Sequence, residues 1–242
     1  MKKRTRYITF NGTLLYCILS FSTALFGQQT IFNVPSTDIL AQGKVYLEFD
    51  AAFKPNSEEA LGRFSSFVPR VVVGVGKDVE VGLNVTGNIQ PGADTTTLVP
   101  AVKWRVYNGG DNGWSIVVGD NLYVPVRNRA YNIGNYSYAQ ASKTFSKTGT
   151  RLTAGAYHFT KNVVAADADR AGGQFGFEQP VNKYLNINAD WFTGQHAAGY
   201  FTPGVAFRLH RKVTGYAGYS IGNSQAINGN HYFYTAIGVN LN

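Results

Sequence analysis

The chain has 242 residues, of which 14% are aromatic, and a formal net charge of +8 at pH 7. Its basic residues form no stripe or cluster in the body of the chain, which argues against a nucleic-acid partner. Its single cysteine, Cys17, lies in the N-terminal segment, so the remaining residues can form no disulfide and no thiolate metal site.

Residues 1–27 have the layout of a secretory signal peptide. Four basic residues, the last of them Arg6, precede the apolar run LLYCILSFSTALF, and small residues follow. The run is shorter than the ~20 apolar residues that a membrane-spanning helix needs. We expect cleavage after Gly27 or Ala24, since both leave a small residue at the cut. Removal of this segment also removes Cys17 and lowers the net charge to +4.

The rest of the chain alternates apolar and polar residues with the period of a β-strand. After a periplasmic lead-in at 28–43, this period predicts twelve strands that build an outer-membrane barrel over 44–242. Most have the length of a tilted strand that crosses a bilayer, and exceed the ~5–6 residues usual in soluble proteins. The predicted strands are 44–53, 65–76, 79–87, 96–107, 114–123, 135–145, 150–160, 171–180, 184–193, 200–210, 212–221 and 230–242.

The connections between these strands alternate in length. Those after even-numbered strands are mostly tight, as at 77–78 and 181–183, whereas those after odd-numbered strands are longer, as at 54–64 and 124–134. Bacterial outer-membrane barrels have short periplasmic turns and longer outer loops. The fold class predicted is therefore all-β, a transmembrane antiparallel up-and-down β-barrel of about 12 strands.

Charged residues recur on one face of the predicted strands. In 44–53, for example, Val45, Leu47 and Phe49 share one face while Glu48 and Asp50 share the other. Charge signs mostly alternate between neighbouring strands, so cross-strand ion pairs are available. A polar lumen accounts for this placement, although the solvated face of a soluble sheet is the alternative. The residues predicted to line the lumen are Glu48, Asp50, Arg70, Glu80, Lys103, Arg105, Arg151, Glu178, Asp190 and Arg208.

Catalytic and cofactor motifs are scarce. The glycine-rich stretch 73–82 fails the dinucleotide pattern because Val79 occupies the third glycine position, and a tight hairpin explains it better. Ser142 and His158, on neighbouring strands, are the only Ser–His pair considered for a lipid-modifying site. We expect neither an enzyme nor a cofactor. No metal is expected either, because no ligand spacing connects the histidines, which are His158, His196, His210 and His231.

Several stretches resemble one protein family. FGFEQPVNKYLNINADWFTG, YFTPGVAFRLHRKVTGYAGYSIGN and NHYFYTAIGVNLN look like the closing strands of uncharacterised bacterial outer-membrane β-barrel proteins, the putative transporters similar to phenol-degradation-pathway (MetA-type) outer-membrane proteins. FNVPSTDILAQGKVYLEFD, at 32–50, is similar to their periplasmic entry and first strand. These motifs are structural, so the resemblance implies the fold rather than a solute. Many outer-membrane barrels end in Phe, whereas this chain ends in Asn242, which weakens the signal for the barrel-assembly machinery.

The function expected from these patterns is passive or facilitated passage of an unidentified small solute across a bacterial outer membrane. The expected partners are outer-membrane lipid and the barrel-assembly machinery, with no nucleic acid. Barrels of about eight strands are filled by side chains, and those of 16–18 strands hold a broad aqueous channel, so twelve strands allow either a narrow pore or a closed lumen. A structural or adhesive barrel with a salt-bridged lumen, or a lipid-modifying enzyme, are the alternatives.

Charge placement predicts a weak preference for anions. In the proposed strand directions, four basic residues fall in the periplasmic half of the lumen against two acidic ones. A net positive constriction favours anions through the field in a narrow passage. Arg105 and Arg151 are expected to carry most of this preference.

Overall fold

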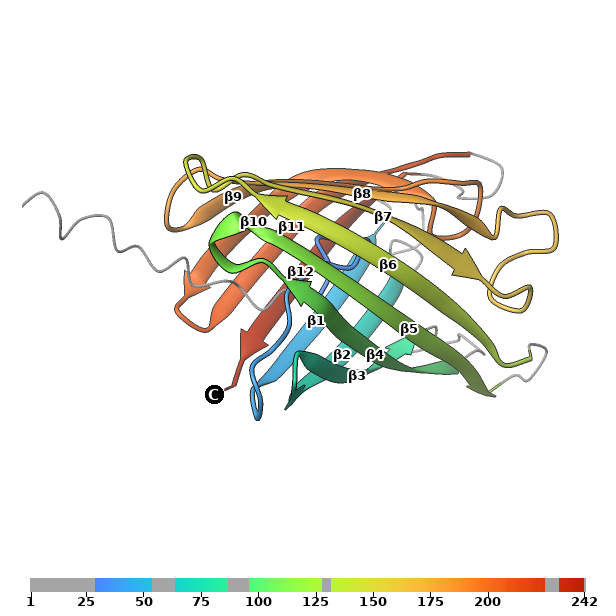
Figure 1. Cartoon of the computed structure of the whole chain (residues 1–242). Helices are drawn as coiled ribbons and strands as arrows, with labels where there is room; N and C mark the ends of the chain where they lie inside the picture. Colours follow the sequence, from blue (N-terminus) through green and yellow to red (C-terminus); the bar gives the residue numbers. More distant parts are fainter. Residues whose placement is uncertain (1–28, 54–63, 87–95, 128–131, 225–230, 242) are drawn as a thin grey trace, which may run out of the picture.

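A computed structural model describes residues 29–53, 64–86, 96–127, 132–224 and 231–241. These form one closed antiparallel barrel in which each strand pairs with its neighbours in sequence and β1 pairs with β12 (Figure 1). The predicted all-β, twelve-stranded barrel is confirmed. Its strands are β1 (Val45–Phe53), β2 (Phe64–Gly76), β3 (Val79–Thr86), β4 (Thr96–Asn108), β5 (Trp114–Arg127), β6 (Gly134–Thr144), β7 (Arg151–Phe159), β8 (Ala171–Pro180), β9 (Leu185–Phe192), β10 (Tyr200–His210), β11 (Val213–Gly222) and β12 (Tyr232–Asn240).

The observed strand ends differ from the predicted ones chiefly in β5. The sequence predicts a long, irregular loop over 124–134, yet β5 continues to Arg127. The register explains this, since Val124 and Pro125 pair with Leu98 and Thr97 of β4, with a register shift next to Thr97. Such a shift accommodates a proline inside a ladder. A single 3-10 turn, η2 (Gly110–Asn112), connects β4 to β5.

The pleat of the barrel turns apolar side chains outward and charged side chains inward. Val81 and Ile187 are 41% and 47% exposed, whereas Glu48 and Asp190 are 5% and 1% exposed. The soluble-sheet alternative requires the reverse, because its apolar face would be the core. An apolar outer surface of this extent suits lipid rather than water. Among the described residues, no helix is long and apolar enough to cross a membrane.

Replacing Ile187 by arginine should impair assembly of the barrel in a bilayer. The side chain projects outward from the third residue of β9, and an arginine on a lipid-facing wall costs up to about 2–4 kcal/mol, most near the midplane. Ile187→Leu keeps the volume and the apolar character, so it is the matched control. The measurement is urea unfolding of both variants in lipid vesicles. Equal unfolding midpoints would contradict a lipid-facing position.

The interior of the barrel is occupied by the chain itself. Residues 29–44, here called the plug, precede β1. Residues 29–40 lie within the barrel, as the blue segment in Figure 1 shows, and the exposed residues 41–44 turn at its end into β1. The sequence treats 28–43 as a periplasmic lead-in, but the described part of that segment contacts the inner wall on many strands. Alternation does not reveal it, because a segment that lies across the barrel has no pleat and presents side chains in all directions.

Candidate functional site

The tip of the plug is a tight turn held by one wall carboxylate. Ile31 donates its backbone N–H to the carbonyl oxygen of Val34 at 2.8 Å, which closes the turn. The backbone N–H groups of Phe32, Asn33 and Val34 then donate to Asp190 Oδ2 at 2.9, 2.6 and 2.7 Å. Successive N–H groups in a turn form a concavity that binds anions. Here the anion is the side chain of Asp190 on β9.

The side chains at the tip fit recesses that glycines leave in the wall. The ring of Phe32 meets Tyr234 edge-on at 5.6 Å between centroids. A Cβ added at Gly204 would lie 2.7 Å from the Phe32 ring, and one at Gly176 would collide with the end of Ile31. Side chains at these two positions would thus fill the space that the tip of the plug occupies.

The stem of the plug, which leads back to β1, contacts several further strands. Thr37 and Ser142 of β6 share a hydrogen bond of 2.6 Å between their hydroxyl oxygens. Lys103 of β4 donates from Nζ to the carbonyl oxygen of Ser36 at 3.2 Å, and Leu40 donates its N–H to Glu80 Oε2 of β3 at 2.8 Å. The stem also pairs its backbone with Gly74 of β2 just before β1 begins. The plug is therefore held along its whole described length.

Cross-strand ion pairs form much of the inner wall. Arg70 lies opposite Glu48 in the register of β1 and β2 and contacts it at 2.6 Å, with Asp50 at 3.3 Å. The Nζ of Lys103 lies 2.8 Å from Glu80 Oε1, also in register. The cross-strand ion pairs that the sequence predicts are thus present in the barrel.

Arg151 links the wall to the plug. Its Nε and Nη2 donate to the two carboxylate oxygens of Glu178 at 2.5 and 2.6 Å, and its Nη1 donates to Asp38 of the plug at 2.6 Å. Arg105 pairs instead with Asp78, which lies in the turn between β2 and β3. All ten residues predicted to line the lumen lie at inward-facing positions, and their part in conduction stays a prediction.

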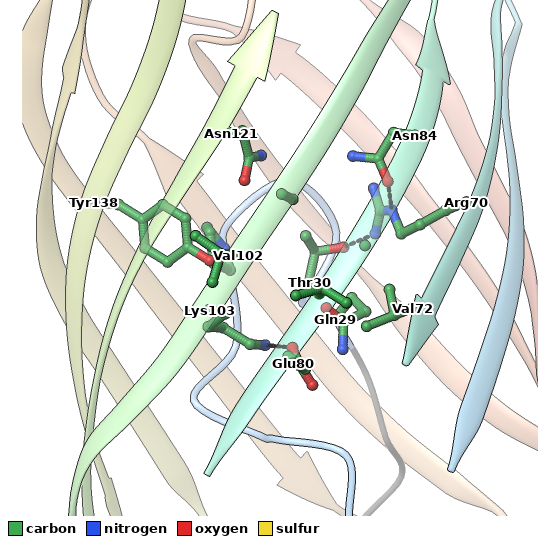
Figure 2. Close-up of a pocket in the computed structure, with 14 residues that line it drawn as sticks. Gln29, Thr30, Arg70, Val72, Glu80, Asn84, Val102, Lys103, Asn121 and Tyr138 are labelled. Atoms are coloured by element: carbon green, nitrogen blue, oxygen red, sulfur yellow. Dashed lines mark hydrogen bonds and ion pairs between the residues drawn. The ribbon is translucent and has the colours of Figure 1, made fainter. Parts of the chain in front are cut away.

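A small cavity remains between the plug and the wall. Figure 2 shows Gln29 and Thr30 of the plug beside Arg70, whose guanidinium donates to Thr30 Oγ1 at 3.2 Å and to Asn84 Oδ1 at 3.0 Å. The cavity measures about 60 Å³ and is lined by residues of both the plug and the wall. The plug therefore narrows the lumen at this level.

An aromatic layer lies beyond the tip of the plug. Val34 packs into a buried cluster with five rings that come from β6, β7 and β9. The imidazole of His196, in the connection after β9, meets three of these rings at centroid distances of 5.1–5.3 Å. The rings of the cluster are Tyr136, Tyr138, Tyr157, Phe159 and Phe192.

Acidification should loosen the connection that carries His196. Burial lowers the pKa of this imidazole below its ordinary value of 6.5, although the Thr193 carbonyl and the charge of Asp169 oppose the shift. The docked imidazole stays neutral while the released one takes a proton. The stability of the docked connection is therefore complete above about pH 6.5 and falls as the pH drops below that value.

The measurement is protection of residues 193–199 from hydrogen exchange at about pH 7.5 and about pH 5.5, corrected for the intrinsic rate. His196→Gln removes the titrating group and should remove the dependence on pH. Equal dependence in both proteins would contradict this assignment.

The Ser–His pair considered from sequence is not assembled. Ser142 faces the lumen, is 2% exposed and bonds to the plug, whereas His158 is exposed on the outer face of β7. The pair fails because its two members have opposite parity in their strands. Within the described residues, no group of three or more His, Cys, Asp or Glu side chains could hold a metal ion.

Comparison with known proteins yields structural likeness alone. No protein-family model and no curated protein matches the chain. The solved structure of KdgM porin in complex with disordered oligogalacturonate is similar with a TM-score of 0.59 and 7% identity, over 81% of this chain and 99% of that chain. The outer membrane phospholipase (OMPLA) dimer of Salmonella typhi with bound calcium is similar with a TM-score of 0.50 and 13% identity, over 90% and 99%. The chain thus shares the fold of outer-membrane barrels.

Proposed function

We propose that this protein is an outer-membrane channel for small solutes and that residues 29–44 close it. The observation that carries the proposal is the position of the plug inside a barrel that is complete without it. The twelve strands pair with one another around the whole circumference, so the wall keeps its ladder when the plug leaves. Apart from its covalent link to β1, the plug is held by non-covalent contacts, which are hydrogen bonds, one ion pair and the packing of its apolar tip.

Polar atoms of the inner wall suit a lumen that water can enter. Both amide atoms of Asn188, the hydroxyl of Thr153 and Oδ1 of Asp190 are buried and have no hydrogen-bond partner within the described protein. Buried polar groups of this kind bond to water where it reaches them. Release of the plug would let water reach this wall.

The proposed setting is the outer membrane of a bacterium. The apolar outer surface supports contact with lipid, and the fold shared with KdgM porin supports an outer-membrane location. A signal peptide at 1–27 and recognition by the barrel-assembly machinery belong to the same proposal. In this proposal, the signal peptide and the barrel-assembly machinery bring the barrel to the membrane in which it would conduct.

Weak anion preference is proposed for the open state only. In the closed state Arg151 faces two carboxylates, of which Asp38 belongs to the plug. Release carries Asp38 away and leaves Arg151 with Glu178 alone. Lys103 and Arg105 keep their acidic partners, so the preference should be small. The measurement is the reversal potential in a salt gradient, before and after charge reversal at Arg105 and Arg151.

The deciding experiment is single-channel recording of the purified protein in planar bilayers. We expect the intact protein to be closed with rare openings, and a variant that lacks residues 30–40 to conduct steadily. Folding of the variant is checked by circular dichroism. A folded variant that does not conduct would support the second candidate, a structural or adhesive barrel with a closed lumen, which the buried ion pairs of the wall favour.

A further inference from the structure

Asp120 interrupts the apolar outer face of β5. The outward positions before it are Trp114, Ile116 and Val118, which are among the exposed large apolar residues. Asp120 shares their parity, because a Cβ on the preceding Gly119 would strike the inward ring of Tyr138. A carboxylate on a lipid-facing wall is costly, so an ionisable residue there indicates a functional site.

The carboxylate of Asp120 is held by two side chains of β6. Ser137 donates from Oγ to Asp120 Oδ2 at 2.5 Å, and Asn135 donates from Nδ2 to the same oxygen at 2.8 Å. Asn135 Nδ2 also lies 3.1 Å from Ser137 Oγ. The serine oxygen therefore has a carboxylate and an amide N–H as immediate neighbours on the outer surface.

His158 completes the arrangement from the other side. Ser137 pairs with Asp120 across β5 and β6 and with His158 across β6 and β7. Directly opposite residues in an antiparallel pair have Cβ atoms about 4.5–5.5 Å apart, so an imidazole can reach the serine hydroxyl. Asp120, Ser137 and His158, here called the outer-wall row, thus cross three adjacent strands at one level.

Small residues lie beside the outer-wall row on β6 and β7. Ala139 pairs with Ala156 on the same outer face. The strip ends at β8, where the ring of Phe175 lies over Gly173, since a Cβ added to that glycine would be 3.0 Å from the ring. The two alanines therefore leave space, bordered by the ring of Phe175, in which an acyl chain can lie against the protein.

We infer that the outer-wall row is a catalytic site that hydrolyses carboxylic esters of membrane lipids. Ser137 supplies the nucleophile, His158 the base, and Asn135 the hydrogen-bond donor for the oxyanion. Asp120 is a positioning residue that holds the serine between the strands. This activity is separate from the proposed channel, because every group in it faces away from the lumen. The proposed nucleophile is therefore Ser137, not Ser142, the serine that the sequence pairs with His158.

The reaction proceeds in two balanced steps. Rotation of the Ser137 hydroxyl from Asp120 toward His158 lets the imidazole take its proton as Oγ bonds to the ester carbonyl carbon. The bond from that carbon to the alcohol oxygen breaks, and the alcohol leaves with the proton from His158. Water then attacks the acyl-serine and gives a proton to His158. The bond to Ser137 Oγ breaks, the serine recovers the proton, and the fatty acid is released.

The test uses the purified full chain in mixed micelles of detergent and phosphatidylethanolamine. Release of fatty acid is measured by mass spectrometry, and reactivity of the serine by an alkyl fluorophosphonate, which bonds to Oγ with loss of fluoride. We expect label on Ser137. Ser137→Ala and His158→Asn should each lower release at least about 100-fold. The matched controls are Ser146→Ala, in the turn before β7, and His210→Asn, at the end of β10, which should leave release unchanged.

The role of Asp120 has its own readout. Asp120→Asn keeps an acceptor oxygen and should retain part of the labelling rate at Ser137, whereas Asp120→Ala should lose most of it while the protein still folds. Fatty-acid release that persists in Ser137→Ala, or an intact protein that neither releases fatty acid nor labels at Ser137, would overturn the proposal. Neither result would affect the conductance experiment, which depends on the lumen.

Discussion

A disulfide between residues 37 and 142 should hold the channel shut until it is reduced. The hydroxyl oxygens of Thr37 and Ser142 lie 2.6 Å apart, so cysteines at these positions place their sulfur atoms within bonding reach. The bond would tie the stem of the plug to β6. In planar bilayers the oxidised Thr37→Cys/Ser142→Cys protein should show no openings, and reductant should restore them. We expect the oxidised variant to lose even the rare openings of the intact protein, because the disulfide does not break during the recording.

The controls for this prediction are the two single-cysteine variants, which cannot form the bond. They should conduct alike with and without reductant. Cys17, the only native cysteine, lies in the segment expected to be removed, and mass spectrometry checks that removal. Unchanged openings in the oxidised double variant, with the disulfide verified by mass, would show that the solute path does not pass the plug.

The strands could be predicted because a barrel wall imposes one simple rule on the sequence. Every second residue faces outward, so apolar residues such as Val81 and Ile187 recur with period two. The inward charges share this register, which is why Glu48 and Arg70 meet across neighbouring strands. Local alternation and short turns together fix the order of a meander without any distant contact.

The plug could not be predicted because its contacts join residues far apart in the chain. Alternation marks Asp190 as inward-facing, but nothing in the sequence connects it to three backbone N–H groups 156–158 residues earlier. Backbone donors carry no signature in side-chain chemistry. The lead-in also lacks a period, so its buried residues, such as Phe32, look like those of an exposed segment.

The outer-wall row could be predicted from the sequence, because its members all occupy outward-facing positions of their strands. Asp120 falls in the apolar register of its strand, where a carboxylate is out of place. His158 has outward parity in β7, so its partner must be an outward residue of β6. That rule excludes Ser142 and selects Ser137. Two side chains on adjacent strands can meet only if they lie on the same face of the sheet, so adjacency of the strands alone does not predict the contact.

Replacing Arg151 by methionine should destabilise the barrel more than any single loss in the plug. The guanidinium bonds to Glu178 through two nitrogens and to Asp38 through the third. Methionine would leave buried Glu178 and half-buried Asp38 without a cation, and breaking a buried ion pair from one side costs about 3–5 kcal/mol. Urea unfolding in lipid vesicles measures the effect, with exposed Arg127→Met as the matched control.

Substitutions at the two partners of Arg151 distinguish its effect on the stability of the wall from its effect on closure by the plug. In the Arg151→Met background, Glu178→Gln removes the unpaired charge within the wall and should recover most of the lost free energy of unfolding. Asp38→Asn removes the charge on the plug, so it should chiefly restore the low open probability in bilayer recordings. If Glu178→Gln restored closure and Asp38→Asn did not, the ion pair across β7 and β8 would itself be the gate, and the plug would only fill the space beside it.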